Sequence, residues 1–286
     1  IMAKIGRSQV KRYGCLFSCL VTRAVHIEMA ESLETSAFLN AFQRFLARRP
    51  KPSCIISDNG SNFIGAKQEL QQCLHEWNQS TINNYMLQKE IEWTMNPPAA
   101  SHFGGAYERM IRSTRKILLA ITNEQRLTDD GLSTLFCIAE GVLNSRPLTI
   151  VPDDSLDINP LTPNQLLRPG TSSDPPLGKF IDRDQFSRRW RQLQFLGDRF
   201  WHRWCKEYYP TLQLRGKWLR PQKNINVDDI VLIVDHNLPR NQWLLGIVTE
   251  VFPAKDQLVR SAKIRTKLGV FHRPIVKLCL VEGVEK

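Results

Sequence analysis

The sequence predicts an α/β protein in which a layered core with a mixed sheet is followed by a helical linker and a small all-β barrel or meander. Apolar runs of strand length come first, in residues 13–29, and short strands then alternate with helical patterns up to about residue 143. Residues 188–208 are basic and aromatic, with apolar residues at helical spacing. Residues 226–281 consist of short β-rich runs separated by Gly, Pro, Asn and Asp.

The core is predicted to begin with two strands and a helix. Residues 13–21 are apolar and predict a central strand, and a turn at Thr22-Arg23 leads into a half-buried strand at residues 24–29. That strand alternates Val25, Ile27 and Met29 with the polar residues His26 and Glu28. Thr35 or Ser36 is expected to cap a helix that ends before Pro50. Its apolar face is Phe38, Ala41, Phe42, Phe45 and Leu46, and Arg48 and Arg49 suit its C-terminal end.

The second part of the core is predicted to alternate strands and helices. A short strand, Cys54-Ile55-Ile56, ends at Asp58, and a helix follows over residues 63–77. Residues 91–95 predict another strand, whereas the two prolines in residues 96–100 exclude regular structure. The helix that carries Glu108 is expected to run to about residue 121. A further helix starts at Thr128 and buries Leu132, Leu135, Phe136, Ala139, Val142 and Leu143.

The C-terminal part divides into three predicted segments. Residues 151–186 are rich in Pro, Asp and Ser and are expected to form a loop-like connection. A helical face in residues 188–208 contains Trp190, Leu193, Phe200, Trp201, Trp204 and Tyr208. The predicted strands of the barrel are residues 230–234, 243–251, 258–264 and 275–280.

Composition limits the class of protein. The 286-residue chain contains no run of 18 apolar residues, and its seven irregularly spaced cysteines argue against a secreted disulfide scaffold. The sequence has no CxxC or HxxxH spacing, so a zinc finger has no support. Because the cysteines do not suggest disulfides, an intracellular, reducing compartment is expected. The net charge of +11 is concentrated in residues 171–286, where 21 Lys and Arg face 12 Asp and Glu. This favours a polyanionic partner, although a merely soluble basic surface remains the alternative.

Two acidic motifs carry the candidate chemistry. Asp58 stands at a strand end and Glu108 on a helix, so folding can bring both carboxylates to one divalent metal. Carboxylate oxygens suit Mg²⁺ or Mn²⁺, which can activate a water or a 3′-hydroxyl for attack on a phosphodiester. The alternative for Asp58-Asn59-Gly60 is ordinary turn chemistry.

The helix of Glu108 also carries two arginines on the same predicted face. At about 100° per residue, Glu108, Arg112 and Arg115 lie within about 60° of one another. A metal-binding carboxylate beside two guanidinium groups can hold a metal and the neighbouring phosphates, but a plain i, i+4 ion pair is equally compatible. The aromatic residues of 188–208 are open to two interpretations, stacking on bases or packing in a core.

Several stretches, taken together and in order, resemble the retroviral-type integrases of BEL/Pao-class retrotransposons. They are Lys11–Phe17, Val21–Glu28, Ser57–Asn62, Pro98–Arg109, Leu143–Leu148 and Asn159–Asn164, followed in the C-terminal part by Arg215–Trp218, Asp229–Ile233 and Arg273–Ile275. The resemblance covers nearly the whole chain.

The resemblance implies a ribonuclease-H-like catalytic core in residues 1–170, a linker with a basic aromatic helix in 171–225 and an SH3-like barrel in 226–286. Such enzymes join element DNA ends to target DNA with a D, D, E triad that binds Mg²⁺ or Mn²⁺. On the matching positions, Asp58 is the second acid and Glu108 the third. Ser61 and Asn62 are expected near the DNA track, and Arg112 and Arg115 face the element DNA end. A homo-multimer acting in the nucleus is expected as well.

The chain departs from this pattern at its first acid. The resemblance places that Asp before the strand beginning near Tyr13, yet residues 1–27 contain no Asp or Glu. The missing Asp is expected upstream of Ile1, and the zinc-binding N-terminal module is missing too. Either the sequence is part of a longer product that supplies the Asp, or it is a decayed or repurposed copy. We therefore expect no strand transfer by this chain alone. Alternatives are a non-catalytic DNA-binding or scaffold protein, and a protein-interaction role dominated by residues 226–281.

Overall fold

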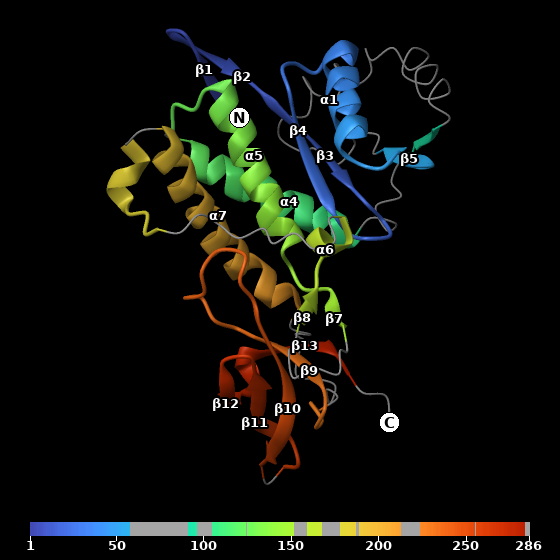
Figure 1. The fold of residues 1–286 in the computed structure, drawn as a ribbon, viewed down its shortest axis with the longest axis vertical. Helices are drawn as coiled ribbons and strands as arrows, with labels where there is room; N and C mark the ends of the chain where they lie inside the picture. The colour runs from blue at the N-terminus through green and yellow to red at the C-terminus, as the bar shows by residue number, and fades with distance from the viewer. Residues whose placement is uncertain are drawn as a thin grey trace. The chain divides into compact units, whose positions relative to one another are not determined.

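The computed structural model describes residues 1–57, 91–95, 105–123, 125–151, 159–167, 178–186, 189–212, 224–254 and 256–283. It contains helices together with parallel and antiparallel strand pairs, which confirms the predicted α/β class (Figure 1). The chain divides into two compact units. Unit 1 comprises Ile1–Ser18 and Val25–Cys137, and unit 2 comprises Cys19–Ala24 and Ile138–Lys286.

The strands of unit 1 form three separate pairs. β1 (Met2–Ile5) and β2 (Ser8–Lys11) form a hairpin that the sequence analysis did not predict, because only Ala3 among its residues is buried. β3 (Tyr13–Ser18) pairs antiparallel with β4 (Val25–Ala30), as predicted. β5 (Cys54–Ser57) pairs parallel with β6 (Glu92–Met95).

Helix α1 (Thr35–Arg48) packs on strands from two of these pairs. Phe42 and Ile91 are fully buried, and Phe17 of β3 and Ile55 of β5 pack against them. The predicted cap is wrong by one or two residues: Glu34 is the N-cap residue, and it makes no side-chain cap hydrogen bond. Packing of the apolar face, rather than a cap, therefore defines where this helix starts.

The polar residues of β4 are buried together with their apolar neighbours. His26 and Glu28 are 5% and 3% exposed, although they alternate with apolar neighbours. Arg44 and Arg48 of α1 both donate hydrogen bonds to the Glu28 carboxylate, so the charge is compensated inside the protein. A buried charge is tolerated only when it is paired and hydrogen-bonded, and periodicity alone does not reveal such partners.

Helices α4 (Gly105–Thr122) and α5 (Asp129–Asn144) confirm two predicted helices. All six residues predicted for the apolar face of α5 are buried, from Leu132 to Leu143. The Thr128 hydroxyl accepts a hydrogen bond from the Gly131 backbone at 3.3 Å, as expected of an N-cap. The division between the two units falls within α5.

Unit 2 contains regular elements where the sequence predicts a loop-like connection. β7 (Thr149–Val151) pairs with β8 (Asn159–Leu161), and α6 (Pro163–Leu167) and the 3₁₀ turn η2 (Asp182–Phe186) follow. These elements are only three to five residues long, too short for a periodic hydrophobic pattern.

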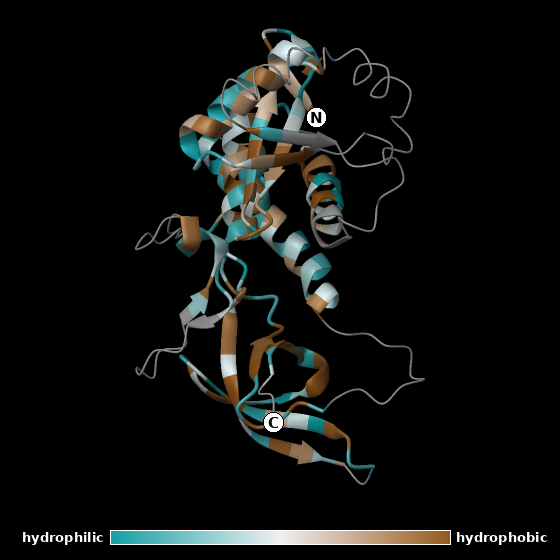
Figure 2. Ribbon diagram, turned by 90° about the vertical axis from the view of Figure 1, so that its right-hand side faces the viewer, coloured by the Kyte–Doolittle hydropathy of each residue, from teal (hydrophilic) through white to brown (hydrophobic). Residues whose placement is uncertain are grey.

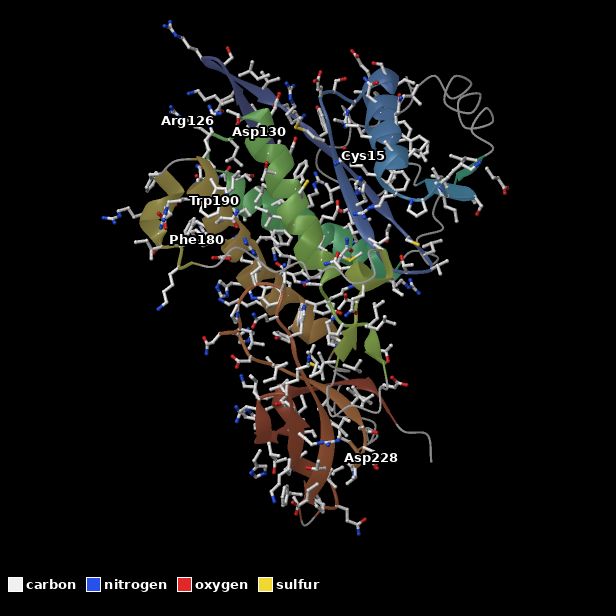
Figure 3. All side chains as sticks on the ribbon, in the orientation of Figure 1. Cys15, Arg126, Asp130, Phe180, Trp190 and Asp228 are labelled. Carbon is white, nitrogen blue, oxygen red and sulfur yellow. The ribbon has the colours of Figure 1, made fainter. Side chains whose placement is uncertain are left out.

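The basic aromatic segment forms helix α7 (Arg189–Leu212). Four of the six residues of its predicted apolar face are buried, whereas Tyr208 is half-buried and Trp190 is 54% exposed. Trp190 instead meets Phe180 edge-on, with ring centroids 5.7 Å apart (Figure 3).

The helices carry both hydrophobic and hydrophilic residues (Figure 2). Within the described residues, no helix has the length and apolar character needed to cross a membrane.

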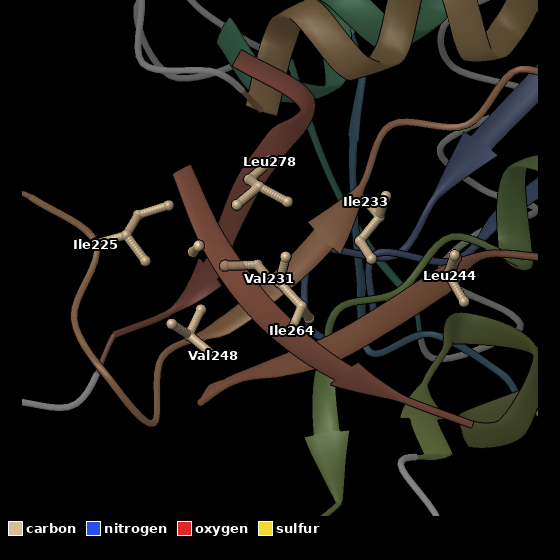
Figure 4. Packing of buried hydrophobic residues seen from close by; sticks show 8 residues of the cluster. Ile225, Val231, Ile233, Leu244, Val248, Ile264 and Leu278 are labelled. Atoms are coloured by element: carbon tan, nitrogen blue, oxygen red, sulfur yellow. The ribbon is translucent and has the colours of Figure 1, made fainter. Parts of the chain in front are cut away.

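Residues 230–282 form an antiparallel sheet of five strands in the order β12-β11-β10-β9-β13. The strands are β9 (Ile230–Ile233), β10 (Leu244–Pro253), β11 (Val259–Thr266), β12 (Gly269–Pro274) and β13 (Leu278–Glu282). Its core contains Val231, Ile233, Val248, Ala262 and Ile264 (Figure 4). β12 was not predicted, and the predicted strand at 275–280 is instead the 3₁₀ turn η3 (Ile275–Lys277) followed by β13.

Candidate nucleic-acid interface

The predicted acidic and DNA-track residues lie mostly outside the described structure. Asp58, Ser61 and Asn62 are outside the described residues, and Glu108 is described only through the backbone of α4. The strand expected to lead to Asp58 is present, since β5 ends at Ser57, one residue before it. The convergence of Asp58 and Glu108 on one metal stays a prediction.

Helix α4 presents Arg112 and Arg115 to solvent. Ile117, Leu118 and Ile121 are buried and fix which side of the helix faces the interior. Arg112 and Arg115 lie on the opposite, exposed side. The helix spans positions 108 to 115 without interruption, so the backbone at Glu108 lies on the same side as both arginines.

The β1–β2 hairpin adds positive charge beside Arg115. Burial lowers the pKa of the Ile1 amine, and repulsion from Lys11 and Arg115 lowers it further. Lys11 and Arg115 therefore each act on the Ile1 amine. Sequence reasoning missed Lys11, because only the hairpin, which has no periodic signal, brings it near α4.

Arg12 is next to Lys11 in sequence but has a structural role. Its guanidinium donates two hydrogen bonds to the Asp129 carboxylate, both at 3.0 Å, and these bonds raise the pKa of Arg12. The Lys4 backbone also donates to the Leu127 carbonyl at 2.7 Å. The two contacts hold the hairpin against the start of α5, so Arg12 is unavailable to a ligand.

A cavity of about 340 Å³ lies between β4, α1 and α5 in unit 1. Glu28, Arg44 and Arg48 line it, together with Ser133 and the apolar residues around them. The Glu28 carboxylate accepts hydrogen bonds from His26 at 2.6 Å, from Arg44 at 3.0 Å and from Arg48. A carboxylate with these three donors is a poor base and a poor metal ligand, so the cluster fastens α1 to β4 rather than performing chemistry.

The stretch Leu143–Leu148, which contributes to the integrase resemblance, is an internal anchor. Ser145 and Arg146 are each 6% exposed. The Trp243 indole donates to the Ser145 hydroxyl at 3.2 Å, and Arg146 donates to the carbonyls of Leu143 and Arg23. Burial lowers the pKa of Arg146, and the neighbouring Tyr208 partly opposes this. The stretch thus ties together segments of unit 2 that are distant in sequence.

The aromatic residues of α7 pack inside unit 2. Trp201 and Trp204 are each 2% exposed, and Tyr208 stacks on Trp204 with ring centroids 5.2 Å apart. The Trp201 indole donates to the Leu238 carbonyl at 3.0 Å. These contacts favour packing over stacking on bases. Across the described ranges, no group of three or more His, Cys, Asp and Glu residues is suited to hold a metal ion.

Comparisons with known proteins give two results. Residues 188–281 match a family described as a family of unknown function, DUF5641, which covers α7 and the five-stranded sheet. Among solved structures, a simian T-cell lymphotropic virus intasome in complex with the PP2A regulatory subunit B56 gamma is similar, with a TM-score of 0.36 and 14% identity. That match covers 100% of this chain and 76% of the other. A similarity at this TM-score does not identify a fold. No curated protein matches.

Proposed function

We propose that this protein is an integrase-derived, nucleic-acid-binding protein, related to the integrases of BEL/Pao-class retrotransposons. The observation that carries the proposal is the exposed side of α4, where Arg112 and Arg115 follow the backbone position of Glu108. A row of cations beside a carboxylate suits a phosphate backbone and a divalent metal. The partner is DNA, both element ends and target, and the chain acts as a homo-multimer in the nucleus.

The strand pairs of unit 1 support the proposal of a ribonuclease-H-like core in residues 1–170. Phe17 of β3 and Ile55 of β5 pack against the same residues under α1. Among the described strands, however, β3 pairs only with β4 and β5 pairs only with β6. One further strand between β3 and β5 would join an antiparallel pair and a parallel pair into a single mixed sheet.

The C-terminal region is proposed to be an SH3-like barrel in residues 226–286, joined to the core through residues 171–225. Its support is the order of the five antiparallel strands and the 3₁₀ turn that separates the last two. Side chains from β9, β10, β11 and β13 meet in one apolar core around Val231 and Ile264 (Figure 4).

The metal chemistry proposed for the intact site requires carboxylates that this chain supplies only in part. Asp58 and Glu108 offer hard oxygen ligands that suit Mg²⁺ or Mn²⁺, and the bound metal would activate the attacking oxygen. Residues 1–27 contain no Asp or Glu, so the acid that the resemblance expects before β3 is not among them. The second candidate function is a non-catalytic DNA-binding or scaffold protein derived from such an integrase.

DNA binding through α4 is tested by measuring the affinity for a labelled duplex against salt concentration. Each phosphate contact contributes about 0.9 to the slope of log K against log salt. Replacing both arginines, as Arg112→Gln with Arg115→Gln, is expected to lower the slope by about 1.8. Lys179→Gln, which removes an exposed cation elsewhere, should leave it unchanged. An unchanged slope in the α4 variant would refute this interface.

Catalysis is tested separately with paired element ends and target DNA in Mg²⁺ or Mn²⁺. The chain is expected to bind DNA without producing joined strands. Joined products that disappear in the Glu108→Gln variant would overturn the proposed inactivity and establish a complete active site.

A further inference from the structure

Helix α7 has one side that is fully used by its own chain. The buried residues on that side include Leu193, Leu196, Phe200, Trp201, Trp204, Cys205 and Tyr209. The Trp201 indole and the Tyr209 hydroxyl donate to the carbonyls of Leu238 and Asp235, which precede β10. The apolar side of the helix is therefore not available to a partner.

The other side of α7 carries a stripe of basic residues, which we call the α7 stripe: Arg199, His202, Arg203 and Lys206. With about 100° per residue, these four positions fall within a sector of about 100°. His202 and Lys206 are exposed, and Arg199 and Arg203 are half-buried. From Arg199 to Lys206 the stripe is about 10 Å long, at about 1.5 Å per residue.

Within the described part of the chain no stripe cation forms an ion pair, but His202 acts on Asp198 and, with Arg240, opposes the rise that burial causes in the pKa of that carboxyl. Arg199 lies over the Phe195 ring, 5.7 Å from its centroid, which leaves its N–H groups free to donate. Arg203 and Lys206 form no ion pair there. The adjacent acid, Asp198, is 3.5 Å from the guanidinium of Arg240, a buried residue of the loop before β10. Asp198 and Glu207 lie at the two edges of the stripe, and the cations occupy the sector between them. This local concentration of positive charge favours an anionic partner.

The chemistry of the stripe fits a phosphate backbone better than a membrane. Duplex DNA carries about one negative charge per 1.7 Å of axis, so a stripe of this length spans several phosphates. Arginine forks match phosphate oxygens, and lysine contributes a point charge. A membrane-binding helix needs an apolar side to insert into the lipid, and here that side is covered by unit 2 itself.

We infer that the α7 stripe binds the phosphate backbone of duplex DNA, as a second contact surface separate from α4. This inference rests on the proposed nucleic-acid partner. Contacts to phosphate oxygens carry no sequence information, so binding through the stripe is expected to be independent of sequence. The buried aromatic side holds the helix rigid, which reduces the entropy lost on binding.

The test measures duplex binding by the full chain between 50 and 200 mM salt, with a probe of about 20 base pairs. The variant Arg199→Gln/Arg203→Gln/Lys206→Gln is expected to lower the slope of log K against log salt by about 2.7. Three such contacts account for about 40-fold of the affinity that the unmodified chain loses over this range. Far-UV circular dichroism and thermal unfolding confirm that each variant is folded.

Two control variants separate charge from structure. Arg199→Lys/Arg203→Lys keeps both charges and should retain the slope, because phosphate recognition here depends on charge. Lys179→Gln removes an exposed cation outside α7 and should also retain it. A loss of binding in the lysine variant as large as in the glutamine variant would contradict the assignment.

The outcomes distinguish this inference from the proposed function. If the unmodified chain binds no duplex at 50 mM salt, the proposed function fails and the inference with it. If the chain binds, and the glutamine variant of α7 keeps the full slope while the α4 variant loses part of its slope, only the α7 assignment is overturned. Binding of poly-glutamate or of phosphatidylserine vesicles that the same glutamine variant abolishes, without any change in duplex binding, would also overturn it.

Discussion

Replacing Glu28 with glutamine tests whether the buried charge cluster fastens α1 to β4. The Glu28 carboxylate accepts hydrogen bonds from Arg44, from Arg48 and from the His26 imidazole. Arg49 donates to Nδ1 of His26 at 3.2 Å, which places the imidazole proton on Nε2, facing Glu28. The carboxylate thus has three donors: two come from α1, and the third, His26 of β4, is hydrogen-bonded by Arg49 at the end of α1.

The expected loss follows from what a glutamine amide can and cannot do at this position. Its oxygen can accept from one guanidinium, but its NH₂ group would face another donor, so at least one charge-assisted hydrogen bond is lost. Such a bond contributes about 1.5–3 kcal/mol. The side chains of Arg44 and Arg48 are 46% and 47% exposed, so water solvates a released guanidinium. This favours the lower part of the range, about 1.5–2 kcal/mol.

Thermal and urea unfolding measure this loss, and hydrogen exchange in peptides from β4 and α1 assigns it to unit 1. The Glu28→Gln variant is expected to melt about 3–8 °C lower. Glu31→Gln is the matched control, because Glu31 lines the same cavity but is exposed, and it should change stability by less than about 0.5 kcal/mol. Equal stabilities of the two variants would refute the reasoning, as would a double-mutant cycle with Arg48→Met that shows no coupling.

Other predictions concern the sheet of unit 2 and the thiols. In Gly246→Ala, the new Cβ would lie 2.3 Å from Ile264 and 2.6 Å from a backbone carbonyl, so we expect a loss of about 2–3 kcal/mol in thermal unfolding. Gly141→Ala, with no atom within 4 Å of the new Cβ, should instead stabilise α5 by about 0.5–1 kcal/mol. Burial tends to raise the pKa of Cys19, but hydrogen bonds from the neighbouring turn outweigh it and lower the pKa, whereas burial raises the pKa of Cys205 to about 12. Iodoacetamide at about pH 8 should therefore alkylate Cys19 faster than Cys205. Peptide mass mapping that finds equal alkylation rates for these two thiols would contradict this.

The elements that the sequence predicts are those that bury apolar residues at a regular spacing. α5 is the clearest example, since all of its predicted apolar positions from Leu132 to Leu143 are buried and Thr128 caps it. The periodicity also located α1, α4 and α7, because each buries a single apolar side. Strands β3 and β4 followed from apolar runs separated by a turn.

The elements that the sequence did not predict depend on partners far along the chain. β1 and β2 are polar, and Arg12 and the backbone of Lys4 hold their hairpin against residues 127–129. β12 pairs with β11 at an edge of the sheet, where its side chains alternate between exposed and half-buried and give no apolar run. The burial of Glu28 depends on arginines 16 and 20 residues later, which no local pattern encodes.

For the candidate site, helical spacing predicts that Glu108, Arg112 and Arg115 share one side of α4, and the side chains of both arginines are exposed. Their role in binding stays a prediction. The α7 stripe was missed for a different reason. The aromatic pattern in 188–208 indicates only the apolar side of the helix. The cations between these aromatic residues have no spacing signal of their own and add only to the overall basic charge. The side on which a long helix is covered depends on tertiary packing, and α7 shows how that packing leaves its cations unpaired.

Gly197 provides the link between packing and this unpaired charge. A Cβ at this position would lie 2.0 Å from the Arg240 guanidinium and 2.7 Å from Ile138, so only glycine lets both side chains approach the helix this closely. Arg240 then donates to the Gln194 side chain at 2.7 Å and lies 3.5 Å from Asp198. Asp198, at one edge of the stripe, is thereby held close to Arg240 as well as to His202. A side chain at residue 197 would displace Arg240, release Asp198 toward the stripe and so weaken phosphate binding without removing a single stripe cation.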